Sequence, residues 1–185
     1  MIQSPLQSHV NTIALGPADR QAMLVHLQTL SSEDRRRNFG TWMTDVALRK
    51  YVEDIVFAQA RCFGVRSDDG ALVGLARLSI NAEGVYGELA VSVLHAHRGH
   101  GAGRALLHAA LNAAWMLGVR TIYVPCMSES NEMKHLAAAF GVDVVLADDA
   151  TTAGGVAPAA HTPGNMVLID SAVRRARFAA IGKLP

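Results

Sequence analysis

Apolar residues in the first third of the chain recur at the spacing of α-helices. Residues 18–29 carry them at Met23, Leu24 and Leu27, and Leu30 follows at the same spacing of three and four positions, which predicts a short helix. Ser31 or Ser32 can cap a second helix, because a hydroxyl there accepts a hydrogen bond from a backbone N–H of the first turn. Thr44 is placed to cap a third helix that continues to Ile55.

From Val56 onward the spacing changes to that of extended strands. Three apolar-rich segments, residues 56–66, 71–80 and 85–94, are separated by the turn sequences SDDG and NAEG. Short polar turns of this kind join neighbouring strands that run in opposite directions. The pattern therefore predicts three consecutive antiparallel strands.

The rest of the chain alternates between helices and strands. A wide apolar stripe predicts a helix over residues 101–117 that stops at Gly118, with the stripe formed by Leu106, Leu107, Ala110, Leu111, Ala114, Trp115 and Leu117. The remaining predicted elements are a strand over 121–126, a helix from Asn131 to Phe140, strands over 142–147 and 165–169, and a tail helix over 171–180. Neither a repeat nor a domain boundary is evident, so we expect a single α/β domain over residues 1–185.

The composition is that of an ordinary globular protein and argues against several partners. Hydrophobic residues make up 50% of the 185 residues, charged residues make up 18%, and the net charge is +1 at pH 7. Such a chain has no basic field to attract nucleic acid or an anionic membrane, so we expect neither as a partner. A secretion signal and a run of membrane-spanning length are not apparent. Two cysteines, Cys62 and Cys126, do not form a disulfide framework, and we expect a cytoplasmic protein.

The segment HRGHGAGRALL, residues 97–107, joins three glycines to the start of a predicted helix. The first N–H groups of a helix have no partner within it, and the helix dipole is positive there, so the segment can bind an anion. Arg98 and Arg104 add two cations, which suit a pyrophosphate. A sharp reversal of the chain is the structural alternative. The segment is not a P-loop, because no Lys-Ser or Lys-Thr pair follows its last glycine, and its antiparallel context argues against a dinucleotide fold.

Residues 88–142 resemble the core of the GNAT N-acetyltransferases. The likeness rests on the strand ELAVSV, the loop RGHGAG with its helix, and a second helix that begins at Asn131 and ends in AFGV. The order of elements fits that fold over residues 56–147. Within the superfamily, the stretches LSSEDRRRNFG and NEMKHLAAAFGV look like the acetyltransferase domains of bacterial protein-lysine acetyltransferases.

The resemblance implies the GNAT fold, an α/β (α+β) fold with a mixed central sheet, antiparallel N-terminal strands and flanking helices. Its two central strands splay apart, and the pantetheine arm of the co-substrate acetyl-CoA lies between them. Val91, Ser92 and Val93 are the expected strand residues of this site, with backbone groups of Val91 and Val93 bonding the arm. The pyrophosphate is expected on Arg98, Gly99, His100, Gly101, Ala102, Gly103 and Arg104. Asn131 matches a position whose amide contacts the cofactor near its thiol end, and it also suits a helix cap.

The implied reaction needs a base. An amine like that of lysine, with a pKa of about 10.4, is protonated at neutral pH and must lose a proton before it attacks a thioester. Glu88 matches the glutamate that serves as base in many relatives, and strand alternation places it on the face of Ala90 and Ser92. A merely solvated glutamate is the alternative. The backbone N–H of Val91 can stabilise the oxyanion of the tetrahedral intermediate.

The chain departs from the commoner family pattern at one position. Many relatives carry a tyrosine six residues after the asparagine, which protonates the leaving thiolate, whereas this chain has Ala137. Ser128, Ser130 or water are the alternatives, or the thiolate leaves unassisted. The sequence thus predicts an acetyl-CoA-dependent N-acetyltransferase that acts on a primary amine, with protein lysine as one candidate. A catalytically degenerate acyl-CoA sensor is the alternative.

Two further expectations concern metals and assembly. Four histidines, His95, His97, His100 and His108, lie close together in the sequence, but the strand and the helix that flank them run in different directions. Cysteines or carboxylates do not join them at the spacing of metal ligands, so we expect no metal. We expect a monomer or a homodimer.

Overall fold

The structure is a computed structural model that describes residues 10–119, 121–125, 146–147 and 166–170. Within these residues the chain forms one sheet with the order β1-β2-β3-β4-β5-β7-β6. Its strands are β1 (Ile13–Leu15), β2 (Ala60–Arg66), β3 (Leu72–Ile80), β4 (Tyr86–Val93), β5 (Thr121–Pro125), β6 (Leu146–Ala147) and β7 (Met166–Asp170). The helices are α1 (Arg20–Thr29), α2 (Ser32–Phe39), α3 (Asp45–Glu53) and α4 (Ala102–Met116), with 3₁₀ turns η1 (Pro17–Asp19) and η2 (His95–His97).

The sheet is mixed, as the sequence predicts. Strands β1 to β4 pair antiparallel in chain order, β4 and β5 are parallel, and β7 is antiparallel to both β5 and β6. The three predicted antiparallel strands are confirmed as β2, β3 and β4. The sequence did not indicate β1, because three residues are too few to show an alternating pattern.

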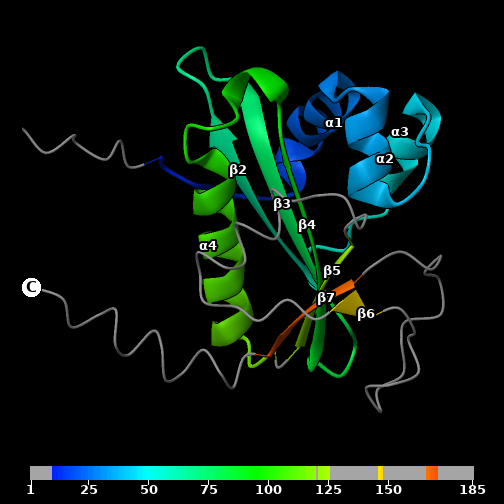
Figure 1. Ribbon diagram of the computed structural model, residues 1–185, viewed down its shortest axis with the longest axis vertical. Coiled ribbons are helices and arrows are strands. Elements are labelled where there is room, and N and C mark those ends of the chain that lie inside the picture. Colours follow the sequence, from blue (N-terminus) through cyan, green and yellow to red (C-terminus); the bar gives the residue numbers. More distant parts are fainter. Residues whose placement is uncertain (1–9, 120, 126–145, 148–165, 171–185) are drawn as a thin grey trace, which may run out of the picture.

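Helices cover both faces of the sheet (Figure 1), with α4 on one face and α1 to α3 on the other. The core beneath α4 contains buried side chains of β3, β4 and the helix, among them Ala76, Leu78, Leu89, Leu106, Leu107, Ala110 and Leu111. The core on the opposite face includes Met23, Leu24, Leu27, Leu48, Val52, Cys62 and Leu75. Strand alternation therefore gives β4 two different faces, and its even-numbered side chains point toward α1 and α3.

The predicted helix ends are largely confirmed. The hydroxyls of Ser31 and Thr44 accept hydrogen bonds from the third backbone N–H of α2 and α3, and Gly118 follows α4 with a φ of 77°. The last turn of α4 differs from the predicted apolar stripe, because Trp115 and Leu117 are exposed. The predicted helices over 131–140 and 171–180 lie outside the described residues. None of the helices in the described ranges has the length and apolarity to cross a membrane.

The Thr44 cap makes a measurable contribution to stability. Its Oγ1 accepts from the Ala47 N–H at 3.2 Å at an exposed helix end. We expect Thr44→Ala to lower the free energy of unfolding by about 1 kcal/mol, because one N–H of the first turn loses its acceptor. Urea denaturation monitored by circular dichroism measures this change. Thr44→Ser keeps the hydroxyl and should remain near the wild type; an equal loss in both variants would contradict the cap.

Candidate functional site

Strands β4 and β5 pair over only part of their length. The parallel register joins Tyr86, Gly87 and Glu88 to residues 121–123, although β4 continues to Val93 and β5 to Pro125. Among the described strands, the part of β4 beyond Glu88 therefore has no partner on this side. The splay between the two central strands, expected from the resemblance, is confirmed.

The backbone direction of this open edge follows from the pairing with β3. Leu94 donates its N–H to Val73 O at 2.9 Å, and Tyr86 O accepts from Asn81 N at 2.9 Å. The backbone N–H and C=O groups of the even-numbered β4 residues therefore point toward β3. In an antiparallel pair the N–H and C=O groups of successive residues point to opposite sides. Val91 and Val93 therefore direct their backbone groups toward the open edge. The resemblance to the GNAT enzymes implies that the pantetheine arm binds there.

A glycine turn leads from this edge to α4. Gly99 and Gly101 adopt φ values of 77° and 88°, which side chains with a Cβ rarely allow. Gly101 is the N-cap residue and supplies no side-chain cap, and the first helical hydrogen bond is donated by Ala105 N at 3.0 Å. The N–H groups of Ala102 and Gly103 precede that bond and point out of the helix end. The turn has the geometry of an anion site.

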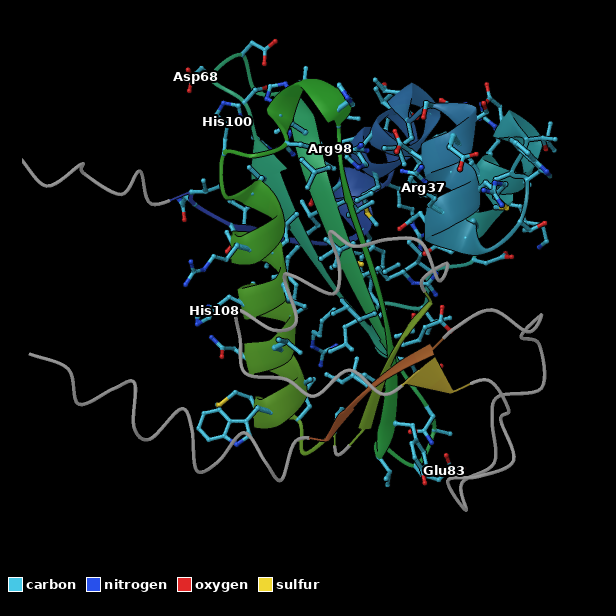
Figure 2. The ribbon with its side chains drawn as sticks, in the orientation of Figure 1. Arg37, Asp68, Glu83, Arg98, His100 and His108 are labelled. Atoms are coloured by element: carbon cyan, nitrogen blue, oxygen red, sulfur yellow. The ribbon has the colours of Figure 1, made fainter. Side chains whose placement is uncertain are left out.

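The side chains around the turn differ in their exposure. His100 and Arg104 are exposed, Gly103 is half-buried, and the Ala102 methyl group is 5% exposed within the core beneath α4. In Figure 2, His100 lies near the start of α4, and His108 points away from the sheet on the outer side of that helix. Ala102 thus anchors the helix start with its methyl group, and its backbone N–H is the group that it offers to an anion.

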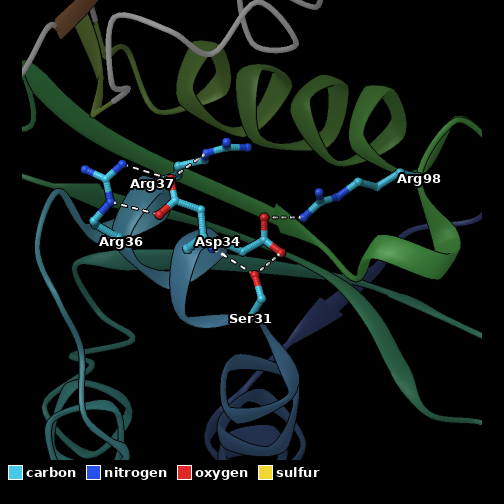
Figure 3. Close-up of polar contacts among 6 residues, drawn as sticks. Ser31, Asp34, Arg36, Arg37 and Arg98 are labelled. Carbon is cyan, nitrogen blue, oxygen red and sulfur yellow. Dashed lines mark hydrogen bonds and ion pairs between the residues drawn. The ribbon is translucent and has the colours of Figure 1, made fainter.

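Arg98 does not extend into solvent but crosses toward α2 (Figure 3). Its Nη2 lies 2.8 Å from Asp34 Oδ1, and its Nε donates to Val93 O at 3.0 Å. Burial raises the pKa of Asp34, but the hydrogen bonds from Arg98 and Ser31 outweigh it and bring that pKa below its ordinary value. Arg98 therefore connects the glycine turn to α2, and it donates a hydrogen bond to the Val93 carbonyl at the end of the open edge.

Ser92 is held from the other face of the sheet. His26 Nδ1 lies 3.0 Å from Leu72 O, and His26 Nε2 lies 2.8 Å from Ser92 Oγ. Because a carbonyl only accepts, Nδ1 carries the proton, and Nε2 accepts from the serine hydroxyl. Burial lowers the pKa of His26 to about 4, against a smaller opposing effect of the Leu72 hydrogen bond. This neutral histidine links α1 to β3 and β4 at the level of the open edge.

Glu88 lies where β4 and β5 separate, on the face that α3 covers. Tyr51 of α3 and Arg77 of β3 are its neighbours there, and the Arg77 guanidinium carbon lies 4.6 Å from the centre of the Tyr51 ring. Burial raises the pKa of Tyr51, Arg77 opposes this, and the Glu88 charge raises it further. The three groups therefore lie within electrostatic range of one another. The sequence alone did not indicate Tyr51, Arg77 or His26 as neighbours of the site residues.

Among the described residues of this site, neither a metal-binding cluster nor a reactive thiol is found. Within the described ranges, histidine, cysteine and carboxylate side chains do not gather in threes that could hold a metal ion. Cys62 is a buried free cysteine, and burial raises the pKa of its thiol to about 11, so it is a poor nucleophile at neutral pH.

Comparison with known proteins assigns the chain to a family. The model of the acetyltransferase (GNAT) family matches residues 26–142, which is more than half of the chain. The chain belongs to the GNAT acetyltransferase family. Its fold and its class, that of the GNAT acetyltransferases, are thereby established. None of the curated proteins with which the chain was compared matches it.

Solved structures of several GNAT proteins share this fold at low sequence identity. The GNAT domain of S. lividans PAT is 16% identical, with a TM-score of 0.64 and coverage of 86% of this chain and 89% of that one. Vibrio cholerae spermidine N-acetyltransferase, in complex with CoA and spermine, is 20% identical, with a TM-score of 0.61 and coverage of 86% and 92%. The ribosomal-protein-S18-alanine N-acetyltransferase of Escherichia coli is 14% identical, with a TM-score of 0.58 and coverage of 86% and 90%.

Several residues that matter for a GNAT acetyltransferase are not described. Asn131, Ala137, Ser128 and Ser130 lie outside the described residues, so their roles stay predictions. Arg98, Ser92 and Glu88 also stay predictions as cofactor and catalytic residues, and the structure adds their protein partners. Those partners belong to α1, α2, α3 and β3, which the sequence alone did not connect with the site.

Proposed function

We propose that this protein transfers an acetyl group from acetyl-CoA to a primary amine. The observation that carries the proposal is the continuity of the open β4 edge with the glycine turn and the uncapped start of α4. An extended amide-containing arm can pair with such an edge as an added strand would, and a pyrophosphate can bind at the helix start. Both features of acetyl-CoA thereby find complementary backbone groups along one line of the molecule.

In the proposed cofactor site, the open edge and the glycine turn have separate tasks. Val91 bonds the pantetheine arm through its backbone, and Val93 does so through its N–H, because Arg98 occupies the Val93 carbonyl. N–H groups of residues 99–104 bind the pyrophosphate. Ser92 contributes indirectly, because its hydroxyl hydrogen-bonds to His26 and so fixes β4 to α1. Arg98 contributes by fixing the turn, because its guanidinium is engaged by Asp34 and Val93 O.

The proposed reaction is direct transfer without a covalent enzyme intermediate. Glu88, directly or through water, takes a proton from the acceptor ammonium, and the free amine attacks the thioester carbonyl carbon. The C–N bond forms while the Val91 N–H stabilises the oxyanion, and collapse of the tetrahedral intermediate breaks the C–S bond. The thiolate leaves and takes up a proton. The second amine proton is lost to water as the amide forms.

The proposal is tested first by ligand binding and turnover. Isothermal titration with CoA and acetyl-CoA at low salt should show one saturable site per chain, and thiol release should depend on an added primary amine. Protein lysine is tested as an acceptor with lysine peptides beside small amines. Lack of affinity for both CoA species would refute the proposal, whereas binding without turnover of any amine would favour the non-catalytic sensor.

The glycine turn offers a matched pair of variants. Gly99 and Gly84 both have positive φ values, of 77° and 70°, and an added Cβ at either would meet no atom within 4 Å. We expect Gly99→Ala and Gly84→Ala each to lower the free energy of unfolding by about 1 kcal/mol, through backbone strain alone. Only Gly99→Ala should weaken CoA binding, by about tenfold. Equal CoA affinity in the two variants would contradict a pyrophosphate at this turn.

A further inference from the structure

Arg77 is a cation on the face of the sheet that carries Glu88. The proposed acetyl transfer gives it no role. It pairs with Ala90 in the β3–β4 ladder, so its side chain lies on the same face of the sheet as Glu88. Glu88 lies two residues before Ala90 on β4. Arg77 and Glu88 are therefore diagonal neighbours, whose Cα atoms lie about 7–8 Å apart. A molecule that presents an amine to Glu88 therefore has Arg77 within a few bond lengths.

The contacts of Arg77 hold its guanidinium in place but leave it incompletely paired. The Arg77 guanidinium lies over the Tyr51 ring, with 4.6 Å between the guanidinium carbon and the ring centre. Phe39 in turn packs edge-on against Tyr51, with ring centres 4.9 Å apart. Among the described residues, Arg77 Nε is the buried side-chain polar atom without a hydrogen-bond partner. Leaving a buried donor unpaired costs free energy, so the contacts within the protein do not fully satisfy this guanidinium.

We propose that Arg77 binds a carboxylate carried by the acceptor, so that the protein acetylates amines with an anionic group near the nitrogen. The proposal rests on the proposed function, because it places the acceptor amine beside Glu88. A planar guanidinium held on an aromatic ring presents parallel N–H donors, which match the two oxygens of a carboxylate. An acceptor with several positive charges and no anion meets repulsion from Arg77 instead, so a polyamine such as spermidine is a poor acceptor here.

The test uses pairs of amines that differ only in the carboxylate. β-Alanine and n-propylamine have the same amine and chain length, as do 4-aminobutyrate and n-butylamine. With saturating acetyl-CoA, wild-type protein should show a kcat/KM at least tenfold higher for the member with the carboxylate. Propionate, which has the carboxylate but no amine, should inhibit competitively against β-alanine. A second arm compares lysine peptides flanked by Glu or by Gln, which distinguishes a free amino acid from a protein as the source of the carboxylate.

Variants of Arg77 assign the effect to this residue. Arg77→Gln should raise KM for β-alanine at least tenfold with little change in kcat, weaken propionate inhibition equally, and leave n-propylamine within twofold. Arg77→Lys keeps the charge without the planar fork and should fall between. Equal losses for β-alanine and n-propylamine, or a wild type without preference for carboxylates, would overturn the inference. In the second case acetyl-CoA binding and amine turnover persist, which separates this failure from a failure of the proposed function.

Discussion

Replacing Glu88 with glutamine should lower kcat at neutral pH by a factor of about 10² or more. General base catalysis contributes roughly 10² to 10⁴ in rate, and the amide of glutamine cannot take a proton from the acceptor ammonium. Glu88 lies where β4 separates from β5, at the start of the open part of the β4 edge. Steady-state thiol release with a saturating amine measures the loss. The dissociation constant for CoA should remain within about twofold, because the variant keeps the shape of the side chain.

Two controls make this result specific to the base. Glu83→Gln removes an exposed carboxylate from the turn between β3 and β4, at the end of the sheet opposite the glycine loop (Figure 2), and should leave the rate unchanged. The Glu88→Gln variant should also recover activity as the pH rises toward the pKa of the amine, about 10.4 for a lysine-like acceptor, because solvent then removes the proton. Full activity of the variant at neutral pH would show that Glu88 is not the base.

The second large effect concerns the pH dependence of folding through His26. Its pKa is about 4 in the folded protein and 6.5 ordinarily, because burial between α1 and the sheet disfavours the charged ring. Between these values the unfolded chain binds more protons, so the contribution of His26 to stability is complete above pH 6.5 and is lost as the pH falls toward 4. The full loss amounts to about 3 kcal/mol, of which about 2 kcal/mol is lost by pH 5.

Chemical denaturation at a series of pH values measures this contribution. His26→Gln should be less stable than the wild type at pH 7, and the difference should shrink as the pH falls, because the variant has no imidazole to protonate. His95→Gln makes the same change at an exposed position and should leave the pH profile of the wild type intact. A wild-type stability that does not vary between pH 7 and 5 would contradict the buried neutral imidazole.

His26 also connects folding with the proposed cofactor site. When its ring is protonated, Nε2 becomes a donor, and Ser92 must then turn its hydroxyl to accept. Ser92 lies between Val91 and Val93 on the strand that forms the open edge. The affinity of the folded protein for CoA should therefore fall only as the pH approaches 4, the pKa of the buried ring, which titrations at matched ionic strength can follow.

Much of the site was predictable because it depends on local chain properties. The glycines near position 100 were recognisable because positive φ angles and close ligand approach both demand them, and Gly99 and Gly101 have such angles. The orientation of Glu88 followed from strand alternation, and the caps at Ser31 and Thr44 followed from hydroxyls placed before helical patterns. Trp115 was an exception, because the sequence predicted it in the apolar stripe and it is exposed. The local sequence does not show whether an apolar residue in the last helical turn has a packing partner.

The partners of these residues were not predictable from the sequence. His26 and Ser92 are 66 positions apart, and they meet only because α1 packs on the face of β4 that carries even-numbered side chains. Asp34 and Arg98 likewise meet because α2 lies beside the end of β4. Such contacts depend on the register of the strands and on helix packing, for which a single sequence carries no direct signal.

The sequence by itself thus determined the elements, the glycine turn and the kind of ligand that the turn can bind, because spacing, caps and φ preferences act within a few residues. Only the tertiary structure decided which side chains surround the turn and the open edge. It turned Arg98 toward Asp34, set His26 behind Ser92, and placed Arg77 on Tyr51 beside Glu88. The physical reason is that burial and pairing, which set the charge and direction of these groups, arise from segments far apart in the chain.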